Sequence, residues 1–492
     1  MSAVLGTVPA TSLPSAGTLA AGLALAFVVI AALVVVMRRR ADAFPLLAVF
    51  ALPFRVPIAT EGRTVNLLVP LYLVVAAGTI THLLPRLLGR GERRDPSRGE
   101  SGGLSPTRAS WWTSPRSVEW LLFAAVGLYA LQTLYSSDRG KAAENIAFFY
   151  VPFALLFLIL RDVRWTRELL ARCLGVAVAL AVLFAGVGFI EYYRKALFLN
   201  PKVVAANQYD NYFRVNSVFF DPSIYGRFLA LVVIAVTTVV LSARRALGDS
   251  AAILRARRRE LLAGAAVLAW LLAGLVTSFS QSSIAALLLG LAVLGAWCWG
   301  VRATVLASAA VVAIAGLLVL LAPASLHFGL KGAKGSASNA TSGRTTLISG
   351  GLELFAKRPL EGYGSGSFET EYKLHSKAAQ ASTENAVSAS HTIPITVAAE
   401  QGIIGLAVYV ALLAAAFLVL FRGAGRSPPR IAVAACFAAL VLHTWTYADF
   451  LEDPFTWTLL AVGVALARAG GSWEARSRAP SYSSVGAGQH SP

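Results

Sequence analysis

Apolar residues occur in blocks of about 20 along most of the chain, and short polar segments rich in arginine separate these blocks. A helix of about 20 residues crosses a bilayer core of about 30 Å and satisfies its own backbone hydrogen bonds there. The pattern therefore predicts an all-α fold, a polytopic membrane bundle of about 12 or 13 transmembrane helices.

The apolar blocks predict the positions of the crossing segments. They are expected near 17–37, 43–54, 64–84, 118–135, 146–160, a segment ending near 190, 223–242, 261–277, 283–300, 303–321, 394–421, 431–447 and 455–467. The second block is short and interrupted by Pro45, so the sequence leaves open whether 41–54 crosses the membrane.

The polar stretches divide the chain into four parts. Residues 1–85 are predicted as N-terminal transmembrane helices, 86–117 as a basic disordered cytoplasmic loop, 118–467 as the transmembrane catalytic core and 468–492 as a disordered cytoplasmic tail. Within the core, 191–223 and 323–393 are predicted to be external loops.

Composition supports a membrane location. The 492 residues are 57% hydrophobic and 14% charged, whereas a soluble protein carries roughly 25% charged residues. The net charge of +18 comes from arginines in short loops, which favours the positive-inside rule over nucleic acid binding. The predicted inside loops hold 27 of the 43 Lys and Arg residues, and 12 of the other 16 lie around Arg214 and Arg344. Positive charge in these two external loops opposes the topology signal, so it indicates an anionic ligand.

Three residues in these loops are candidates for binding that ligand. Arg214 and Arg227 flank the start of a predicted helix, and Arg344 begins a predicted amphipathic helix on the outer membrane surface. The planar arginine fork matches two phosphate oxygens. The alternatives are a lipid headgroup contact for Arg344 and snorkelling to the surface for Arg227. Lys357 and Arg358 are expected to be interface anchors.

His391 stands where the long external loop meets a predicted helix. With a pKa near 6.5 in an unperturbed setting, a histidine can accept a proton near neutral pH. The alternative is an ordinary surface histidine, and Glu400 is expected to have a structural role. Three cysteines without paired spacing, and no cluster with metal-ligand spacing, predict neither a metal nor a cofactor.

Three sequence patterns, in this order, resemble the superfamily of O-antigen ligases and O-antigen polymerases, which are bacterial membrane glycosyltransferases. They are Arg214 with Ser217-Val218-Phe219-Phe220-Asp221-Pro222, then Ser342-Gly343-Arg344 through Pro359-Leu360-Glu361-Gly362-Tyr363-Gly364-Ser365-Gly366-Ser367-Phe368, then His391 followed by Gly402-Ile403-Ile404-Gly405. Thr392 departs from the Asn, Ser or Gln that usually follows this histidine, so the role of that amide is open.

The resemblance implies a GT-C-like fold and a metal-independent, inverting glycosyltransferase. Its active site would face the external side of the bacterial cytoplasmic membrane. The implied donor is a glycan on undecaprenyl pyrophosphate and the implied acceptor a lipid-linked glycan, with membrane lipids and polysaccharide-assembly proteins as further partners and no nucleic acid. By the same resemblance His391 is the catalytic base, and Arg214 and Arg344, with Arg227, bind the pyrophosphate.

Several functions stay open at this stage. A polymerase of O-antigen or exopolysaccharide is favoured over a ligase that attaches polymer to lipid A core, and over a protein O-oligosaccharyltransferase. A lipid-linked oligosaccharide flippase would need charges within the bundle, and a coupled transporter would need ionisable residues at mid-membrane. The predicted spans contain very few, which disfavours both.

Overall fold

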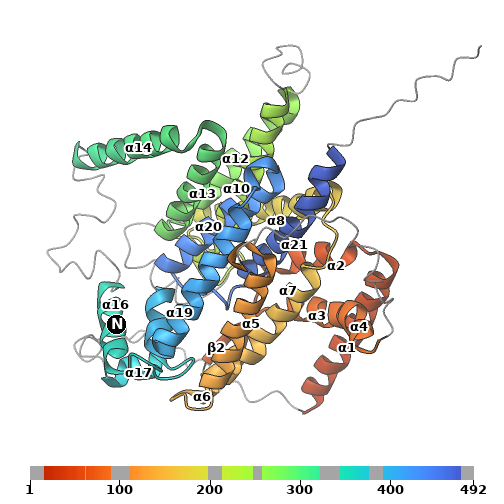
Figure 1. Cartoon of the computed structure of the whole chain (residues 1–492), viewed down its shortest axis with the longest axis vertical. Helices are drawn as coiled ribbons and strands as arrows, with labels where there is room; N and C mark the ends of the chain where they lie inside the picture. The colour runs from red at the N-terminus through yellow and green to blue at the C-terminus, as the bar shows by residue number, and fades with distance from the viewer. Residues whose placement is uncertain are drawn as a thin grey trace, which may run out of the picture.

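The computed structural model describes residues 16–60, 63–89, 111–197, 213–247, 258–321, 344–375 and 392–477. Within these ranges the chain forms a bundle of helices together with one small β hairpin (Figure 1). The short helices α6, α16 and α17 and strand β2 lie at the lower end of the bundle in Figure 1, which corresponds to the predicted external side.

The first half of the chain contains short elements between longer helices. Its elements are α1 (Ala16–Arg39), α2 (Ala43–Ala51), β1 (Val56–Thr60), β2 (Arg63–Leu67), α3 (Val69–Gly78), a π-helical turn (Thr79–Leu83), α4 (Leu84–Leu87), a 3₁₀ turn (Trp111–Thr113), α5 (Pro115–Gln132), α6 (Arg139–Asn145), a π-helical turn (Ile146–Tyr150), α7 (Val151–Leu160), α8 (Arg167–Arg194) and α10 (Pro222–Leu247).

The second half begins with a helical hairpin. Its elements are α12 (Arg258–Thr277), α13 (Gln281–Trp299), α14 (Val301–Leu321), α16 (Arg344–Lys357), α17 (Phe368–His375), α19 (Ile393–Phe421), a 3₁₀ turn (Ala424–Arg426), α20 (Pro428–Thr446) and α21 (Pro454–Ser477).

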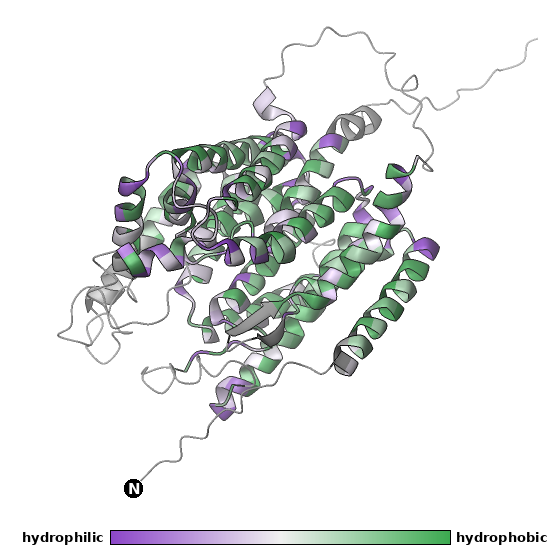
Figure 2. Cartoon of the chain, turned by 90° about the horizontal axis from the view of Figure 1, so that it is seen from below, coloured by the Kyte–Doolittle hydropathy of each residue, from purple (hydrophilic) through white to green (hydrophobic). Residues whose placement is uncertain are grey.

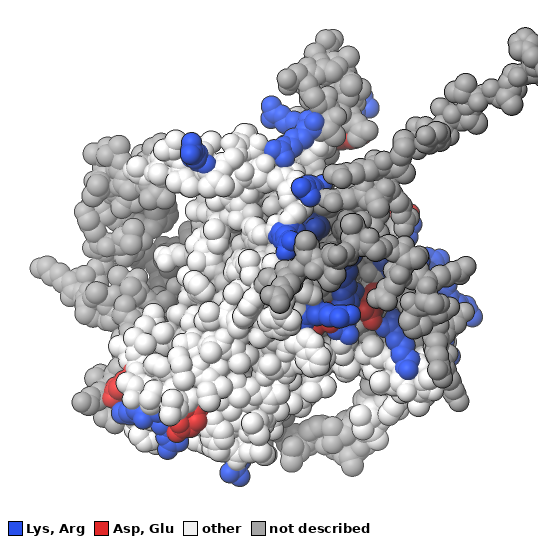
Figure 3. Space-filling view, in the orientation of Figure 1, with Lys and Arg blue, Asp and Glu red and all other residues white. Residues whose placement is uncertain are grey.

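Nine helices in the described ranges are long and apolar enough to cross a membrane, and two shorter apolar helices, Val301–Val311 and Pro454–Ala469, accompany them. Apolar residues dominate the bundle helices (Figure 2), and a broad uncharged surface separates the groups of charged residues visible in Figure 3. The prediction of a polytopic helical membrane protein is confirmed. The count of 12 or 13 crossings stays a prediction.

The N-terminal region departs from the predicted boundaries. The block 43–54 forms only the nine-residue helix α2, and nine residues of helix span about 14 Å, too short to cross a bilayer. Strands β1 and β2 follow and pair antiparallel from Val56 opposite Leu67 to Thr60 opposite Arg63. The helix predicted over 64–84 therefore begins at Val69, because its first residues belong to a strand rich in β-branched side chains.

The two predicted disordered segments are only partly described. Most of the loop 86–117 lies outside the described residues, and so do residues 478–492 of the tail. Helix α21 continues to Ser477, so the first part of the predicted tail is helical.

The centre of the bundle is α10, which packs against α8, α12, α13 and α20. Phe184, Phe219 and Phe228 form an aromatic cluster on it, with ring centroids 5.4–5.9 Å apart. Gly290 on α13 allows close helix packing, because a Cβ there would lie 2.2 Å from Ile234 Cδ1. By contrast, most residues of α1 are exposed, as expected for a helix that faces lipid.

Helix α19 contains a break at Gly402, where φ is 64° and ψ is −163°. A Cβ at Gly402 would lie 2.2 Å from the carbonyl oxygen of Leu360, and a Cβ at Gly362 would lie 2.3 Å from the carbonyl oxygen of Glu400. Backbone therefore touches backbone at this crossing, and only glycine combines this conformation with this approach.

We expect Gly402→Ala to lower the free energy of unfolding by about 2 kcal/mol or more, because it adds a methyl group at a strained position with no free space. Gly127→Ala is the matched control. Gly127 lies in helix α5 with nothing within 4 Å of an added Cβ, so this variant should be as stable as the wild type or up to about 1 kcal/mol more stable. Thermal unfolding of the detergent-purified protein measures both, and equal stabilities would contradict the role of Gly402.

Candidate active site

The segment that carries Arg214 lies against the turn between α12 and α13. Arg214 is half-buried, and its Nε donates a hydrogen bond to the carbonyl oxygen of Ser278 at 3.4 Å. The backbone N–H of Val215 donates to the carbonyl oxygen of Thr277 at 3.2 Å. These two bonds fix the position of Arg214 at the outer end of the bundle.

Ser217 attaches the same segment to α8. Its backbone N–H donates to Glu191 Oε2 at 2.7 Å, and its hydroxyl donates to the carbonyl oxygen of Phe184 at 2.8 Å. Ser217 has a positive φ of 53°, which costs a non-glycine residue about 1 kcal/mol. The two hydrogen bonds offset that cost, so the small residue after Arg214 in the predicted motif is a structural anchor.

A cluster of buried serines joins the outer ends of α10, α13 and α20. Ser283 Oγ donates to the carbonyl oxygen of Ser223 at 3.0 Å and lies 3.2 Å from His443 Nε2. A Cβ at Gly226 would lie 2.7 Å from Ser283 Oγ and 3.0 Å from Ser278 Oγ. Ser278 therefore touches both the Arg214 segment and the first turn of α10.

Arg227 points into the protein. Its side chain is 1% exposed and forms an ion pair with Asp453, which is fully buried, at 2.7 Å between Nη2 and Oδ2. Apart from this pair, the guanidinium nitrogens have no hydrogen-bond partner among the described residues. The predicted alternative that Arg227 snorkels to the surface is wrong, and its contact with a pyrophosphate stays a prediction.

Asp453 has two roles at this site. Besides pairing with Arg227, its Oδ1 accepts a hydrogen bond from the Phe455 N–H at 2.9 Å at the start of α21. Burial raises the pKa of the carboxyl, and Arg227 opposes that shift. Asp453 was not among the residues predicted from the sequence, although the run Asp449 to Pro454 between two apolar blocks holds three acids and no base, which was a signal for a buried partner of Arg227.

Helix α16 lies alongside α19 with the same direction. A Cβ at Gly351 would lie 2.5 Å from Ile395 Cγ2, and the N–H of Ile403 donates to the carbonyl oxygen of Pro359 at 2.8 Å. Both contacts join residues 44 positions apart in sequence, so the N-terminus of α16, at Arg344, lies at the same end as Thr392, the residue before α19. His391 and the side chain of Arg344 lie outside the described residues.

Glu400 holds the glycine-rich turn that follows α16. Its Oε2 accepts a hydrogen bond from the Gly366 N–H at 2.9 Å, and its Oε1 accepts one from the Phe368 N–H at 3.0 Å. Gly362, Gly364 and Gly366 all have positive φ. Glu400 therefore has the structural role that the sequence predicted.

The buried face of α16 differs in part from the predicted one. Leu347, Gly351 and Leu354 are buried, whereas Leu352, which was predicted on the apolar side, is 47% exposed. The burial pattern follows i, i+4 and i+7, which is a helical face toward α19. Thus the helix is amphipathic as predicted, although its apolar face covers protein.

Lys357 and Arg358 contact neighbouring side chains and backbone. Lys357 Nζ pairs with Glu353 Oε1 at 3.2 Å and donates to the carbonyl oxygen of His375 at 2.7 Å. The Arg358 guanidinium lies 4.6 Å from the centroid of the Tyr363 ring. Both residues therefore connect α16 to the segment that follows it, and their role as interface anchors stays a prediction.

A second acid between α20 and α21 faces α6. Glu452 Oε1 accepts a hydrogen bond from Asn145 Nδ2 at 3.0 Å, and the same nitrogen lies 2.9 Å from the Tyr129 hydroxyl. Burial raises the pKa of Glu452 to about 8, with Asp449 adding to the shift. Burial therefore disfavours the charged form of Glu452.

The described parts of the predicted site fall into two separate groups of contacts, and His391 lies outside the described residues. Arg214 and Arg227 lie around the α10 start, and Arg344 and Thr392 lie at the starts of α16 and α19. Convergence of the two groups on one ligand stays a prediction.

Comparison with known protein families covers the group at the starts of α16 and α19. Residues 265–410 match the family model described as O-antigen ligase. The match runs from α12 into α19 and includes Arg344 and His391, while Arg214 and Arg227 precede it. No curated protein matches the chain. The match covers 146 of the 492 residues and confirms the predicted resemblance to the ligase and polymerase superfamily.

We expect Asp453→Asn to lower the free energy of unfolding by about 3 kcal/mol or more, because it leaves the buried Arg227 charge unpaired. Arg227→Met should be similarly damaging. The double variant Arg227→Met/Asp453→Asn should recover part of the loss, because it removes both charges. Thermal unfolding in detergent gives the coupling energy, and strictly additive losses would argue against the pair.

Proposed function

We propose that the protein transfers a glycan from an undecaprenyl-pyrophosphate donor to a glycan acceptor at the outer face of the bacterial cytoplasmic membrane. The observation that carries this proposal is the O-antigen ligase family match, which spans both the α16 start and the α19 start. It is supported by the common direction of α16 and α19, which brings Arg344 and Thr392, the residue next to His391, to the same end of this helix pair.

His391 acts as the general base in this proposal. It takes the proton from an acceptor hydroxyl as that oxygen attacks the anomeric carbon of the donor glycan. The bond from this carbon to the pyrophosphate oxygen breaks, and the bonding electrons leave with the pyrophosphate. A direct displacement of this kind inverts the anomeric configuration and needs no metal. General base catalysis typically contributes about 10²–10⁴-fold to the rate.

Arg214 and Arg344 stabilise the pyrophosphate as its negative charge grows. Support for Arg214 comes from its fixed backbone and its Nε bond to Ser278, which orient the guanidinium before substrate arrives. Preorganised donors of this kind are worth about 3 kcal/mol each in enzymes that stabilise a developing anion. Arg227 contributes through the buried pair with Asp453, which holds α10 beside α21.

Polymerisation of lipid-linked repeats is the activity we favour. A ligase that transfers polymer to lipid A core, and a protein O-oligosaccharyltransferase, use the same donor chemistry and differ in the acceptor. The purified protein incubated with a lipid-pyrophosphate glycan distinguishes them. A ladder of products means polymerase, single transfer to added lipid A core means ligase, and vesicle translocation without product means a flippase and overturns the proposal.

We expect His391→Ala to reduce glycan transfer by about 10²-fold or more, because no base would remain to accept the hydroxyl proton. His375→Ala is the matched control, since His375 lies in the same part of the chain on the surface and pairs with Glu371 at 2.8 Å. Product formation by both purified variants, at equal membrane insertion, is the measurement. A wild-type rate of glycan transfer in His391→Ala would contradict the assignment of His391 as the general base.

We expect Arg344→Lys to be nearly as damaging as Arg344→Ala, because lysine cannot make the two parallel bonds of a guanidinium. The loss for either variant should be about 10²-fold in transfer rate. Arg139→Lys, at an exposed position of α6, serves as the control and should retain wild-type activity. A normal rate with Arg344→Lys would mean that charge alone is sufficient.

A further inference from the structure

The other end of the bundle contains a cavity of about 550 Å³ between the N-terminal helices and the core. The end of α1, the start of α2, the end of α4, the segment after α7 and the start of α8 surround it. Its lining comprises Ala41, Asp42, Phe44, Pro45, His82, Arg86, Ile159, Asp162, Val163, Arg164, Thr166, Glu168, Leu169 and Arg172. None of these residues belongs to the candidate active site.

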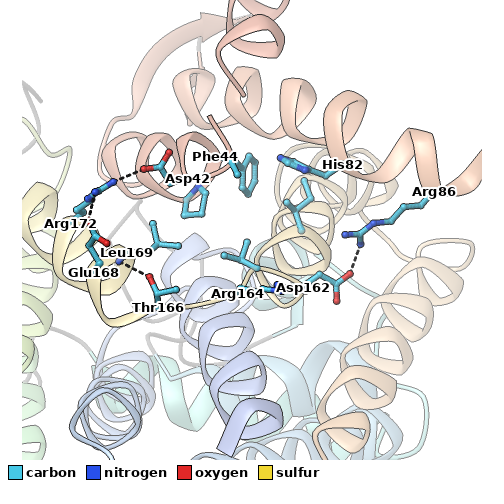
Figure 4. A pocket seen from close by; sticks show the side chains of 14 residues that line it. Asp42, Phe44, His82, Arg86, Asp162, Arg164, Thr166, Glu168, Leu169 and Arg172 are labelled. Carbon is cyan, nitrogen blue, oxygen red and sulfur yellow. Dashed lines mark hydrogen bonds and ion pairs between the residues drawn. The ribbon is translucent and has the colours of Figure 1, made fainter. Parts of the chain in front are cut away.

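Ion pairs stand on two sides of this cavity (Figure 4). On one side Arg172 Nη1 lies 2.7 Å from Asp42 Oδ2, and Arg172 also pairs with Glu168. On the other side Arg86 Nη1 lies 2.5 Å from Asp162 Oδ2. Between the two pairs lie apolar side chains, including Phe44 and Leu169. The cavity therefore has polar walls and an apolar floor.

Three Asp or Glu and three Arg residues line the cavity, and further positive charge lies next to it. Each of the three lining acids already pairs with an arginine. Arg164 is exposed and has no acidic partner among the described residues. Three further exposed arginines, Arg38, Arg39 and Arg40, directly precede the lining residue Ala41. The site consequently favours an anion with an apolar part.

The position of the cavity identifies the source of that anion. The cavity lies where the membrane-crossing helices α1, α4, α7 and α8 begin or end, which is the depth of lipid headgroups. Helix α1 beside it is exposed along most of its length, as expected for a helix that lipid surrounds. By the positive-inside rule this arginine-rich end faces the cytoplasm, where anionic lipids attract basic segments.

We propose that this cavity binds one anionic phospholipid, with its phosphate diester at Arg164 and the arginines that end α1, and its glycerol and upper acyl chains over the apolar floor. A bound lipid would connect α1 and α2 to α7 and α8, since its phosphate and chains would touch all four. The site differs from the proposed pyrophosphate site in its end of the bundle and in its residues, so the proposal does not depend on the transfer reaction.

Native mass spectrometry of the full-length protein in detergent tests the proposal. The probes are short-chain phosphatidylglycerol, short-chain phosphatidylcholine and inorganic phosphate, titrated separately. We expect phosphatidylglycerol to bind about tenfold more tightly than phosphatidylcholine, because one extra charged contact is worth roughly that factor. Displacement of phosphatidylglycerol by an equal concentration of inorganic phosphate would mean a soluble-anion site and would overturn the proposal.

The variant Arg164→Glu tests whether lipid binds at this cavity. It should weaken phosphatidylglycerol binding about tenfold or more and leave thermal unfolding unchanged without lipid, because Arg164 is exposed and has no acidic partner in the described residues. Arg139→Glu makes the same charge change at an exposed position at the other end of the bundle and should bind like the wild type. Equal weakening by both variants would reflect overall charge and would refute a specific site.

Discussion

The contact between the glycine-rich turn and the broken helix α19 determines where the candidate catalytic residues lie. Glu400 binds the N–H groups of Gly366 and Phe368, and Gly402 lets the backbone of Leu360 approach within contact distance. This contact sets the register between α16 and α19. Because both helices run in the same direction, the register also sets the level of Arg344 relative to Thr392, the residue next to His391. A catalytic role for these residues depends on this backbone packing.

The polar residues around the start of α10 are subject to a different constraint, the free-energy cost of burying a charge. Arg227 and Asp453 are both inside the protein, and either charge alone would be strongly destabilising there. Their pairing joins α10, the most enclosed span, to the start of α21. The serine cluster next to it satisfies polar groups where α10, α13 and α20 meet. The Arg227–Asp453 pair and the serine cluster therefore connect the ends of α10, α13, α20 and α21 beside the segment of Arg214.

At the opposite end of the bundle, charged groups are also ion-paired, and there they form an extended network. Arg161 and Arg468 share Glu119 between α5, α7 and α21, and Asp162 links them to Arg86 on α4. This network fixes the edge of the cavity for which a phospholipid is proposed. We thus propose two separate anion sites, one for a reacting pyrophosphate at the outer end and one for a resident lipid at the opposite end.

The sequence by itself determined the helical membrane fold and nearly all helix positions, because long apolar blocks have one stable form in a bilayer. It also indicated Arg214, Arg344 and His391 through motif order and through charge that opposes the topology rule. Tertiary structure decided what no local pattern encodes. The partner of Arg227 is Asp453, 226 positions later, and the burial of Leu354 instead of Leu352 follows from where α19 lies. The strand pairing after α2 overrode an apolar pattern that also fits a helix, since periodicity does not specify which backbone partner will be available.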